Sequence, residues 1–137
     1  MKKNTLIALF IMMVAAILPS CGGGSSNNSP AATVNKAFDY IAAKDFKGAA
    51  SLYVSGENKP LTEEESQKLQ GMLAMASKQY EENGGIKEIS ILEEKISDDG
   101  NTAVVKQKIV YKDGTEDTSD TDLVKVDGKW YFSLKMN

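Results

Sequence analysis

The chain of 137 residues carries 16 basic and 19 acidic side chains, a formal charge of −3, and it contains neither histidine nor arginine. Without histidine, Ser-His-Asp and Cys-His nucleophile systems, imidazole acid–base catalysis and imidazole metal sites are excluded. Without arginine, the planar group that clamps phosphate or carboxylate with two hydrogen bonds is missing. An acidic domain is also a poor partner for nucleic acid. We therefore expect no nucleic acid partner and no cofactor.

The N-terminal segment has the layout of a secretory signal. A basic start over residues 1–4 precedes an apolar run from Leu6 to Leu18, which is shorter than the roughly 20 residues of a transmembrane helix. The string over residues 17–21, Ile-Leu-Pro-Ser-Cys, resembles the lipobox of bacterial lipoproteins, in which the chain is cut before an acylated cysteine. The resemblance implies a signal peptide over residues 1–20, lipidation at Cys21 and a membrane anchor.

A tether and one domain follow the cysteine. Residues 21–29 are rich in Gly, Ser and Asn, a composition typical of a flexible coil. Residues 30–137 are long enough for one compact domain and too short for two. Gly22 follows the cysteine, and by resemblance to lipoprotein sorting this favours the outer membrane. We expect a protein of the cell envelope, anchored by lipid in the outer membrane and facing the periplasm.

Three helices are predicted at the start of this domain. Ser29-Pro30 suits a helix start, and apolar residues at helical spacing predict a first helix over 31–43. Asp45 can cap a short second helix over 46–53, which a loop follows. The third helix, over 63–82, begins with the capping box Thr62-Glu-Glu-Glu65 and ends at Asn-Gly-Gly over 83–85.

Four strands are predicted after the third helix. Three Asp-Gly pairs, at 99–100, 113–114 and 127–128, lie fourteen residues apart, and Asp-Gly between β-type runs is a strong hairpin signal. The predicted strands span residues 86–97, 102–112, 116–126 and 129–136. They form an antiparallel meander in which neighbours in sequence pair.

The turns also predict the register of this meander. A two-residue turn at 127–128 places Phe132 opposite Leu123 and Trp130 opposite Lys125. The core face then receives Val105, Ile109 and Tyr111 from the preceding strands. We expect Trp130 to be buried under the third helix, with Leu134 and Met136 on its face.

The opposite face is predicted to be charged. A three-residue turn around 113–114 pairs lysines with acids across the second hairpin. Lys112, Lys108 and Lys106 then face Glu116, Asp120 and Asp122, in that order. The acidic run from Glu116 to Asp122 is therefore interpreted as a solvated sheet face.

Two segments carry a family resemblance. Residues 37–50, with their Lys-Asp-Phe corner, and residues 123–132, with Gly-Lys-Trp after the last turn, resemble the nuclear-transport-factor-2-like (NTF2-like, cystatin-like) superfamily. More closely, the chain resembles an uncharacterised lipoprotein family of Gram-negative bacteria within it. The resemblance implies an α+β fold, in which N-terminal helices pack on a four-stranded antiparallel meander as a cone. No hairpin is predicted between the second and third helices, which would leave the mouth of the cone more open.

The cone implies a pocket between the sheet and the long helix. The residues available to line it are Tyr53, Met72, Met75, Tyr80, Tyr111, Trp130 and Phe132. Aromatic residues and methionines at such spacing are also typical of plain core packing, and this alternative stays open. We expect the domain to bind a small apolar ligand or an envelope protein partner without catalysis.

An isomerase- or dehydratase-like enzyme is the alternative function. It would need a pocket carboxylate as base and a tyrosine hydroxyl as donor, and the superfamily contains such enzymes as well as binding modules. Asp39, Tyr40 and Tyr111 are candidates, and the facing of three further acids is open. These acids are Glu88, Glu94 and Asp117. The segment 113–117 lacks the pattern of a calcium-binding loop, so no metal site is predicted.

Overall fold

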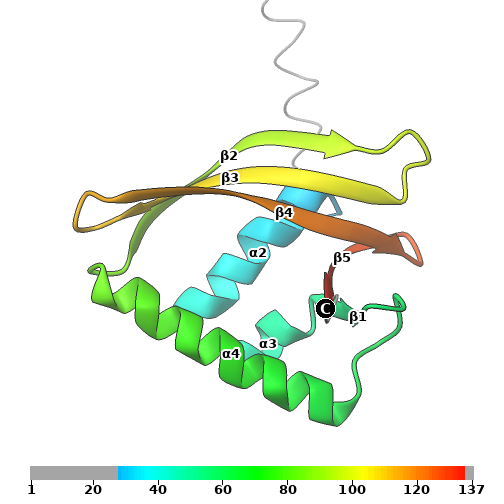
Figure 1. Cartoon of the computed structure of the whole chain (residues 1–137), viewed down its shortest axis with the longest axis horizontal. Helices are drawn as coiled ribbons and strands as arrows, with labels where there is room; N and C mark the ends of the chain where they lie inside the picture. Colours follow the sequence, from blue (N-terminus) through cyan, green and yellow to red (C-terminus); the bar gives the residue numbers. More distant parts are fainter. Residues whose placement is uncertain (1–27, 135–137) are drawn as a thin grey trace, which may run out of the picture.

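The computed structural model describes residues 28–134 (Figure 1). The predicted signal peptide, Cys21 and all but the last two residues of the predicted tether lie outside this range, as does Met136. The described chain forms three helices and a five-stranded sheet in the order β1-β5-β4-β3-β2. The fold class is therefore α+β, as the sequence predicts.

The helices begin where the capping signals predict. α2 (Pro30–Ala42) starts after Ser29, whose hydroxyl accepts a hydrogen bond from the Ala32 N–H at 3.1 Å. α4 (Glu63–Glu82) starts with the complete capping box. Here Glu65 N–H donates to Thr62 Oγ1 at 3.3 Å, and Thr62 N–H donates to Glu65 Oε2 at 2.8 Å. Both termini thus satisfy backbone donors that have no partner inside the helix.

The second helix and the sheet differ from the prediction. α3 ends early (Phe46–Ala50), and Tyr53, predicted as its last residue, instead begins strand β1 (Tyr53–Ser55). β1 pairs in parallel with β5 (Lys129–Leu134), where Phe132 N–H donates to the Leu52 carbonyl at 2.9 Å. The predicted four-stranded antiparallel sheet is thus wrong in this detail. Local spacing cannot reveal a pairing between segments almost eighty residues apart.

The remaining strands form the predicted meander. β2 (Ile86–Ile96), β3 (Thr102–Tyr111), β4 (Glu116–Val126) and β5 pair in sequence order and antiparallel. The last hairpin has the predicted register, with Leu123 opposite Phe132 and Lys125 opposite Trp130. Gly114 and Gly128 adopt φ of 91° and 79° in their turns, a left-handed conformation that glycine accepts without strain.

The register of the second hairpin is shifted from the prediction. Lys106 lies opposite Asp120 and Lys108 opposite Thr118, so the predicted lysine–acid pairs are displaced by two residues. The reason is the turn, which closes between Tyr111 and Thr115 because Asp113 Oδ1 accepts hydrogen bonds from Thr115. An even shift keeps every side chain on its predicted face.

The core lies in two clusters. One packs α2 against the sheet, and the other packs the three helices together. The first contains Val34, Ala37, Ala103, Val105, Leu123, Trp130 and Phe132. The second contains Ile41, Ala49, Ala50, Leu69 and Leu73.

Trp130 is buried, with 5% of its surface exposed, but under α2 and not under α4 as predicted. The hydroxyl of Thr33 on α2 donates to the Trp130 carbonyl at 3.4 Å. Figure 1 shows α2 next to the sheet, with α4 at the far side of the helical layer. The shorter helix therefore occupies the position that the prediction gave to the longer one.

Candidate functional site

A polar patch interrupts the helix-facing side of the sheet. On β3 this side is formed by Ala103, Val105, Gln107, Ile109 and Tyr111, all buried. Opposite them on β4 lie Leu123, Thr121, Ser119 and Asp117. We use the name polar patch for Gln107, Asp117, Ser119 and Thr121.

Gln107 is the centre of the polar patch. Only 5% of its surface is exposed, and its Nε2 donates to Ser119 Oγ at 3.0 Å and to Thr121 Oγ1 at 2.8 Å. Its carbonyl oxygen Oε1 is buried and has no hydrogen-bond partner among residues 28–134. A buried acceptor without a partner costs about 1–3 kcal/mol of folding free energy. The two hydroxyls therefore hold the amide in place while its oxygen stays unpaired.

The β4 side of the polar patch is open to solvent. Asp117 and Ser119 are exposed although they lie on the face that is turned toward the helices. Leu123, on the same face of the same strand, is fully buried. The helices therefore cover one half of this face of β4 and leave the other half accessible.

Two tyrosines border the polar patch. The rings of Tyr80 on α4 and Tyr111 on β3 have centroids 6.1 Å apart. Burial raises the pKa of Tyr80, and the neighbouring Tyr111 and Asp117 raise it further. Burial likewise raises the pKa of Tyr111, with smaller contributions from Asp117 and Asp113. Both hydroxyls stay protonated at neutral pH and can donate hydrogen bonds.

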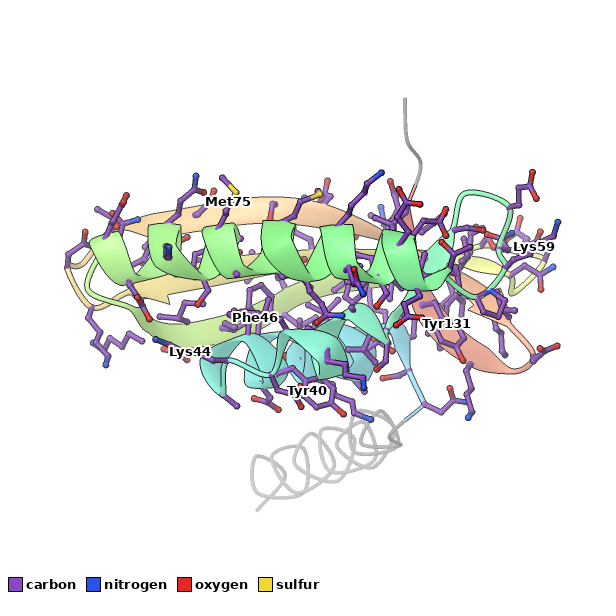
Figure 2. All side chains as sticks on the ribbon, turned by 90° about the horizontal axis from the view of Figure 1, so that it is seen from below. Tyr40, Lys44, Phe46, Lys59, Met75 and Tyr131 are labelled. Carbon is purple, nitrogen blue, oxygen red and sulfur yellow. The ribbon has the colours of Figure 1, made fainter. Side chains whose placement is uncertain are left out.

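The residues predicted to line a pocket lie in different places. The rings of Tyr53 and Phe132 lie tilted against each other with centroids 4.8 Å apart. Burial raises the pKa of Tyr53, with a smaller contribution from the neighbouring Tyr80. Met72 and Met75 lie on the surface of α4, 61% and 67% exposed. Figure 2 shows Met75 on the side of α4 that is turned away from α2.

Two of these residues border shallow surface depressions. Tyr53 borders one of about 320 Å³, beside Pro60 and Leu61. Trp130 borders another of about 490 Å³, beside Thr33 and Leu52. A common pocket lining of all seven residues stays a prediction.

The candidate acids are dispersed. Asp39, Glu88 and Glu94 are exposed on α2 and β2. Asp117 and Glu94, which pair with Ile109 and Val105, lie on the same side of the sheet as Tyr111. Within residues 28–134, no hydrogen bond joins Asp117 to the hydroxyl of Tyr80 or Tyr111. Over the same range, no three acidic, histidine or cysteine side chains are grouped as metal ligands.

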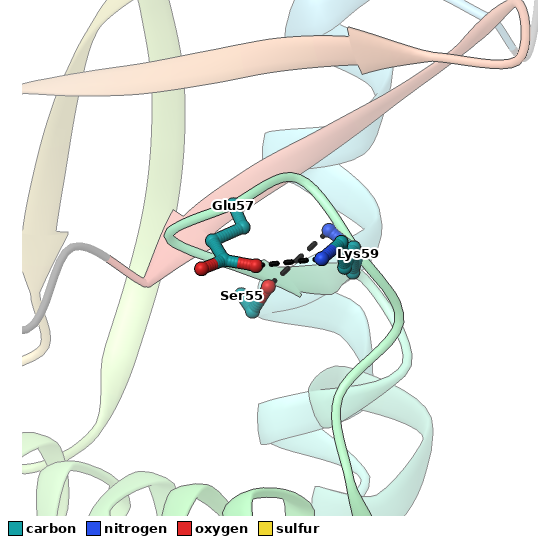
Figure 3. A network of polar contacts seen from close by, with 3 residues as sticks. All are labelled: Ser55, Glu57 and Lys59. Carbon is teal, nitrogen blue, oxygen red and sulfur yellow. Dashed lines mark hydrogen bonds and ion pairs between the residues drawn. The ribbon is translucent and has the colours of Figure 1, made fainter.

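A second polar network has a structural role. Lys59 forms an ion pair with Glu57 at 2.7 Å, and its backbone N–H donates to Ser55 Oγ at 3.2 Å (Figure 3). The side chains of the ion pair are more than 70% exposed, so the pair contributes little to stability. These contacts close the turn after β1 and supply no group for binding or catalysis.

Sequence reasoning missed Gln107. The alternation Ala103, Val105, Gln107, Ile109, Tyr111 contains one polar residue in a row of core positions. A buried polar side chain is rarer and more informative than an exposed apolar one. This break in the alternation is the signal that could have identified it.

Within the described residues, no helix combines the length and apolar character needed to cross a membrane. No curated protein matches the chain. The solved structures that are similar to it include the following two. One is a proposed NTF2-like transpeptidase from Campylobacter jejuni, 25% identical, with a TM-score of 0.62 over 78% of this chain and 100% of that chain.

The other is a SEC-C motif containing protein from Rhodopseudomonas palustris, 18% identical, with a TM-score of 0.52 over 84% of this chain and 83% of that chain. Together with the helices and mixed sheet described above, the similarity to the Campylobacter protein indicates an NTF2-like fold. Residues 20–133 match the model of a family described as a domain of unknown function, DUF4878. Because that match spans most of the 137 residues, the chain belongs to the DUF4878 family.

Proposed function

We propose that the domain is a non-catalytic binding module whose ligand places an apolar group with an N–H or O–H donor against the polar patch. The observation that carries this proposal is the buried, unpaired Oε1 of Gln107. Natural proteins satisfy nearly all buried polar groups, and the exceptions call for a physical reason. A ligand donor that displaces the atoms covering this oxygen would complete the hydrogen bonding of the amide and recover the free energy that the unpaired oxygen costs.

Neighbouring surfaces suit such a ligand. Met72 and Met75 expose flexible, polarizable side chains on α4, and methionine adapts to apolar groups of different shape. The protonated hydroxyls of Tyr80 and Tyr111 offer donors nearby. The ligand would therefore combine an apolar body with a small number of polar groups.

The chemistry of the polar patch supports binding over covalent catalysis. Ser119 Oγ accepts its hydrogen bond from the amide of Gln107, and an amide nitrogen cannot take the proton that a serine nucleophile must lose. The chain also has no histidine to act as that base. For these reasons we do not transfer the transpeptidase activity that is proposed for the Campylobacter protein.

A thermal-shift experiment tests the binding proposal. The probes are N-alkyl acetamides with one N–H, each matched by the N,N-dialkyl amide without a donor. We expect secondary amides to raise the melting temperature, because stabilisation grows as RT ln(1 + [L]/Kd). The variant Gln107→Leu should lose this response, whereas Lys106→Gln, on the opposite face of β3, should keep it. Equal responses in wild type and Gln107→Leu would contradict the proposal.

The alternative enzyme can be tested separately. Isomerase-like chemistry would use Asp117 as base with Tyr80 or Tyr111 as donor. Turnover of a ketosteroid-type substrate that disappears in Asp117→Ala would replace the binding proposal. We expect no turnover in either protein, since the exposed carboxylate lacks the hydrogen-bonded, apolar surroundings that tune a catalytic base.

We further propose that lipid on Cys21 anchors this module in the cell envelope. The lipobox-like string over residues 17–21 supports this, because several acyl chains together give stable membrane attachment. Metabolic labelling with an acyl tracer tests it in the full chain. Label should be present in wild type and absent in Cys21→Ala, and label persisting in the variant would refute the assignment.

A further inference from the structure

The strand β4 leaves part of its edge unpaired. β5 pairs with β4 only between Leu123↔Phe132 and Val126↔Lys129, and then continues to Leu134 beside β1. Figure 1 shows β5 turning away while β4 runs on toward the opposite end of the sheet. Among residues 28–134, no strand pairs with Glu116–Asp122 on the side away from β3. We call this stretch the free edge.

The backbone groups at the free edge can be assigned from the neighbouring hydrogen bonds. Tyr111 N–H donates to the Thr115 carbonyl at 2.9 Å, and Lys125 N–H donates to the Asn101 carbonyl at 2.8 Å. Hydrogen-bonded and non-bonded positions alternate in an antiparallel pair, so odd-numbered residues of β4 bond to β3. The N–H and C=O groups of the even-numbered residues of β4, such as Thr118, therefore point away from β3 in the plane of the sheet.

The side chains of the free edge are acidic. Glu116, Asp120 and Asp122 lie on the outer face and Asp117 on the helix-facing side. Lys106 and Lys108 on β3 offset this charge in part, and Lys108 Nζ forms an ion pair with Glu116 Oε1 at 3.7 Å. A second copy of this chain pairing along the same edge would bring these acids against one another, which is destabilising. Charge complementarity favours a basic strand instead.

The polar patch lies beside this edge. Gln107 donates from Nε2 to Ser119 in the middle of the free edge, and its Oε1 is buried without a partner among the described residues. A strand added there would turn every second side chain toward the polar patch. Its other side chains would lie beside the acids of the outer face.

We propose that an extended segment of a partner protein, with basic side chains at every second position and apolar ones between them, adds as a sixth strand to the free edge. This inference rests on the proposed function and names the class of ligand. Main-chain hydrogen bonds supply affinity in such strand addition, and alternate side chains supply specificity. The lysines or arginines of the segment lie beside the outer-face acids, and its apolar residues lie over the polar patch.

Fluorescence anisotropy with the purified full chain in detergent tests the proposal. The probe is a fluorescein-labelled peptide, Lys-Val-Lys-Val-Lys-Val-Lys, with blocked termini. Two derivatives carry N-methyl groups on either the lysine or the valine amides. We expect one methylated set to abolish binding and the other to retain it, because alternate amides face the partner strand. Loss of binding by the peptide methylated at its lysine amides indicates antiparallel addition. Loss of binding by the peptide methylated at its valine amides indicates parallel addition.

A matched pair of variants locates the binding strand. Thr118→Pro removes an N–H that points away from β3, so no bond to β3 is lost, and a sheet tolerates proline at such an edge position. The substitution should weaken binding by about tenfold or more. Thr118→Val keeps the N–H and should bind within about twofold of wild type. Unchanged affinity in Thr118→Pro, binding of both methylated peptides, or absence of binding by wild type would each overturn the proposal.

Two further outcomes concern the occupant of the free edge. Self-association of wild type that is lost in Thr118→Pro, measured by sedimentation, would identify a second copy as the occupant and overturn the proposal of a basic segment. If the peptide fails to bind while secondary amides still stabilise wild type and not Gln107→Leu, only the proposed strand addition is refuted. The proposed function would then stand, so the two failures are distinguishable.

Discussion

The helix-facing side of the sheet consists of two halves with opposite character. In one half, Val105, Leu123 and Trp130 are buried against α2 with at most 5% of their surface exposed. In the other half, the same strands β3 and β4 present the polar patch, part of which is open to solvent. The two halves thus lie on neighbouring stretches of β3 and β4, and β5 adds Trp130 to the apolar half.

The two halves also differ in how well their groups are satisfied. Burial of the apolar half removes hydrocarbon surface from water, the dominant favourable contribution to folding. The polar half keeps a buried carbonyl oxygen without a partner at Gln107. Features that oppose stability tend to persist where a function requires them. The contrast therefore separates residues whose replacement should unfold the protein from residues whose replacement should alter binding.

The largest effect is expected at the centre of the apolar half. Trp130→Ala should lower the free energy of unfolding by about 3–5 kcal/mol, the range for truncating a buried aromatic residue. Urea unfolding followed by circular dichroism measures this. Met75→Ala is the matched control on the exposed flank of α4 and should change stability by less than about 0.5 kcal/mol. A loss below about 1 kcal/mol in Trp130→Ala would show that the apolar half does not hold the fold together.

A smaller effect of opposite sign is expected in the polar half. Gln107→Leu removes the unpaired oxygen and keeps a side chain of similar size. The free energy of unfolding should stay unchanged or rise by about 1 kcal/mol, while the thermal response to secondary amides disappears. The same urea experiment measures the first part. A loss of more than about 2 kcal/mol would show that the amide stabilises the fold and would break the comparison.

The smallest effect concerns pH. The pKa values of Tyr80 and Tyr111 are raised by burial first, and then by neighbouring groups that include Asp117. The folded state therefore holds these protons more tightly than the unfolded state, whose tyrosines ionise near pH about 10. This contribution to stability is complete below that pH and is lost as the pH rises through the raised pKa values.

Removing the charge of Asp117 should reduce this effect. In Asp117→Asn the pKa of both tyrosines falls, so the alkaline loss of stability becomes smaller. Ultraviolet titration of tyrosine ionisation and urea unfolding above pH 10 measure the two quantities. Asp120→Asn, on the outer face of the same strand, is the control and should leave the titration unchanged. An unchanged titration in Asp117→Asn would place that carboxylate away from the tyrosines.

Several elements were predictable because their signals are local. The capping box at Thr62 and Glu65 marked the start of α4, and the Asp-Gly turns marked the meander. The register of the last hairpin also followed from its turn. The second hairpin was displaced because Asp113 bonds to Thr115 and centres the turn one residue earlier. A turn segment that can close at more than one pair of residues does not fix the register of its hairpin by composition alone.

Other features depended on the packing of distant segments. β1 exists because three residues after α3 meet the edge of β5, a contact that no local pattern encodes. The exposure of Met72 and Met75 follows from the rotation of α4, which buries Leu69 and Leu73 instead. The candidate site was only partly predictable for the same reason. Tyr80 and Tyr111 were candidates from the sequence, but their proximity to each other and to Asp117 required the folded chain.

The sequence by itself determined that histidine and arginine are absent, where the helices start, where the hairpins turn, and on which side of the sheet residues such as Val105, Leu123 and Phe132 lie. These follow from composition, local hydrogen bonding and the two-residue period of a strand. Only the tertiary structure decided that α2 covers Trp130, that β5 leaves β4 at Leu123, and that Gln107 is buried with its oxygen unpaired. Those features arise where elements far apart in sequence meet, because burial and pairing across a fold depend on all the surfaces in contact.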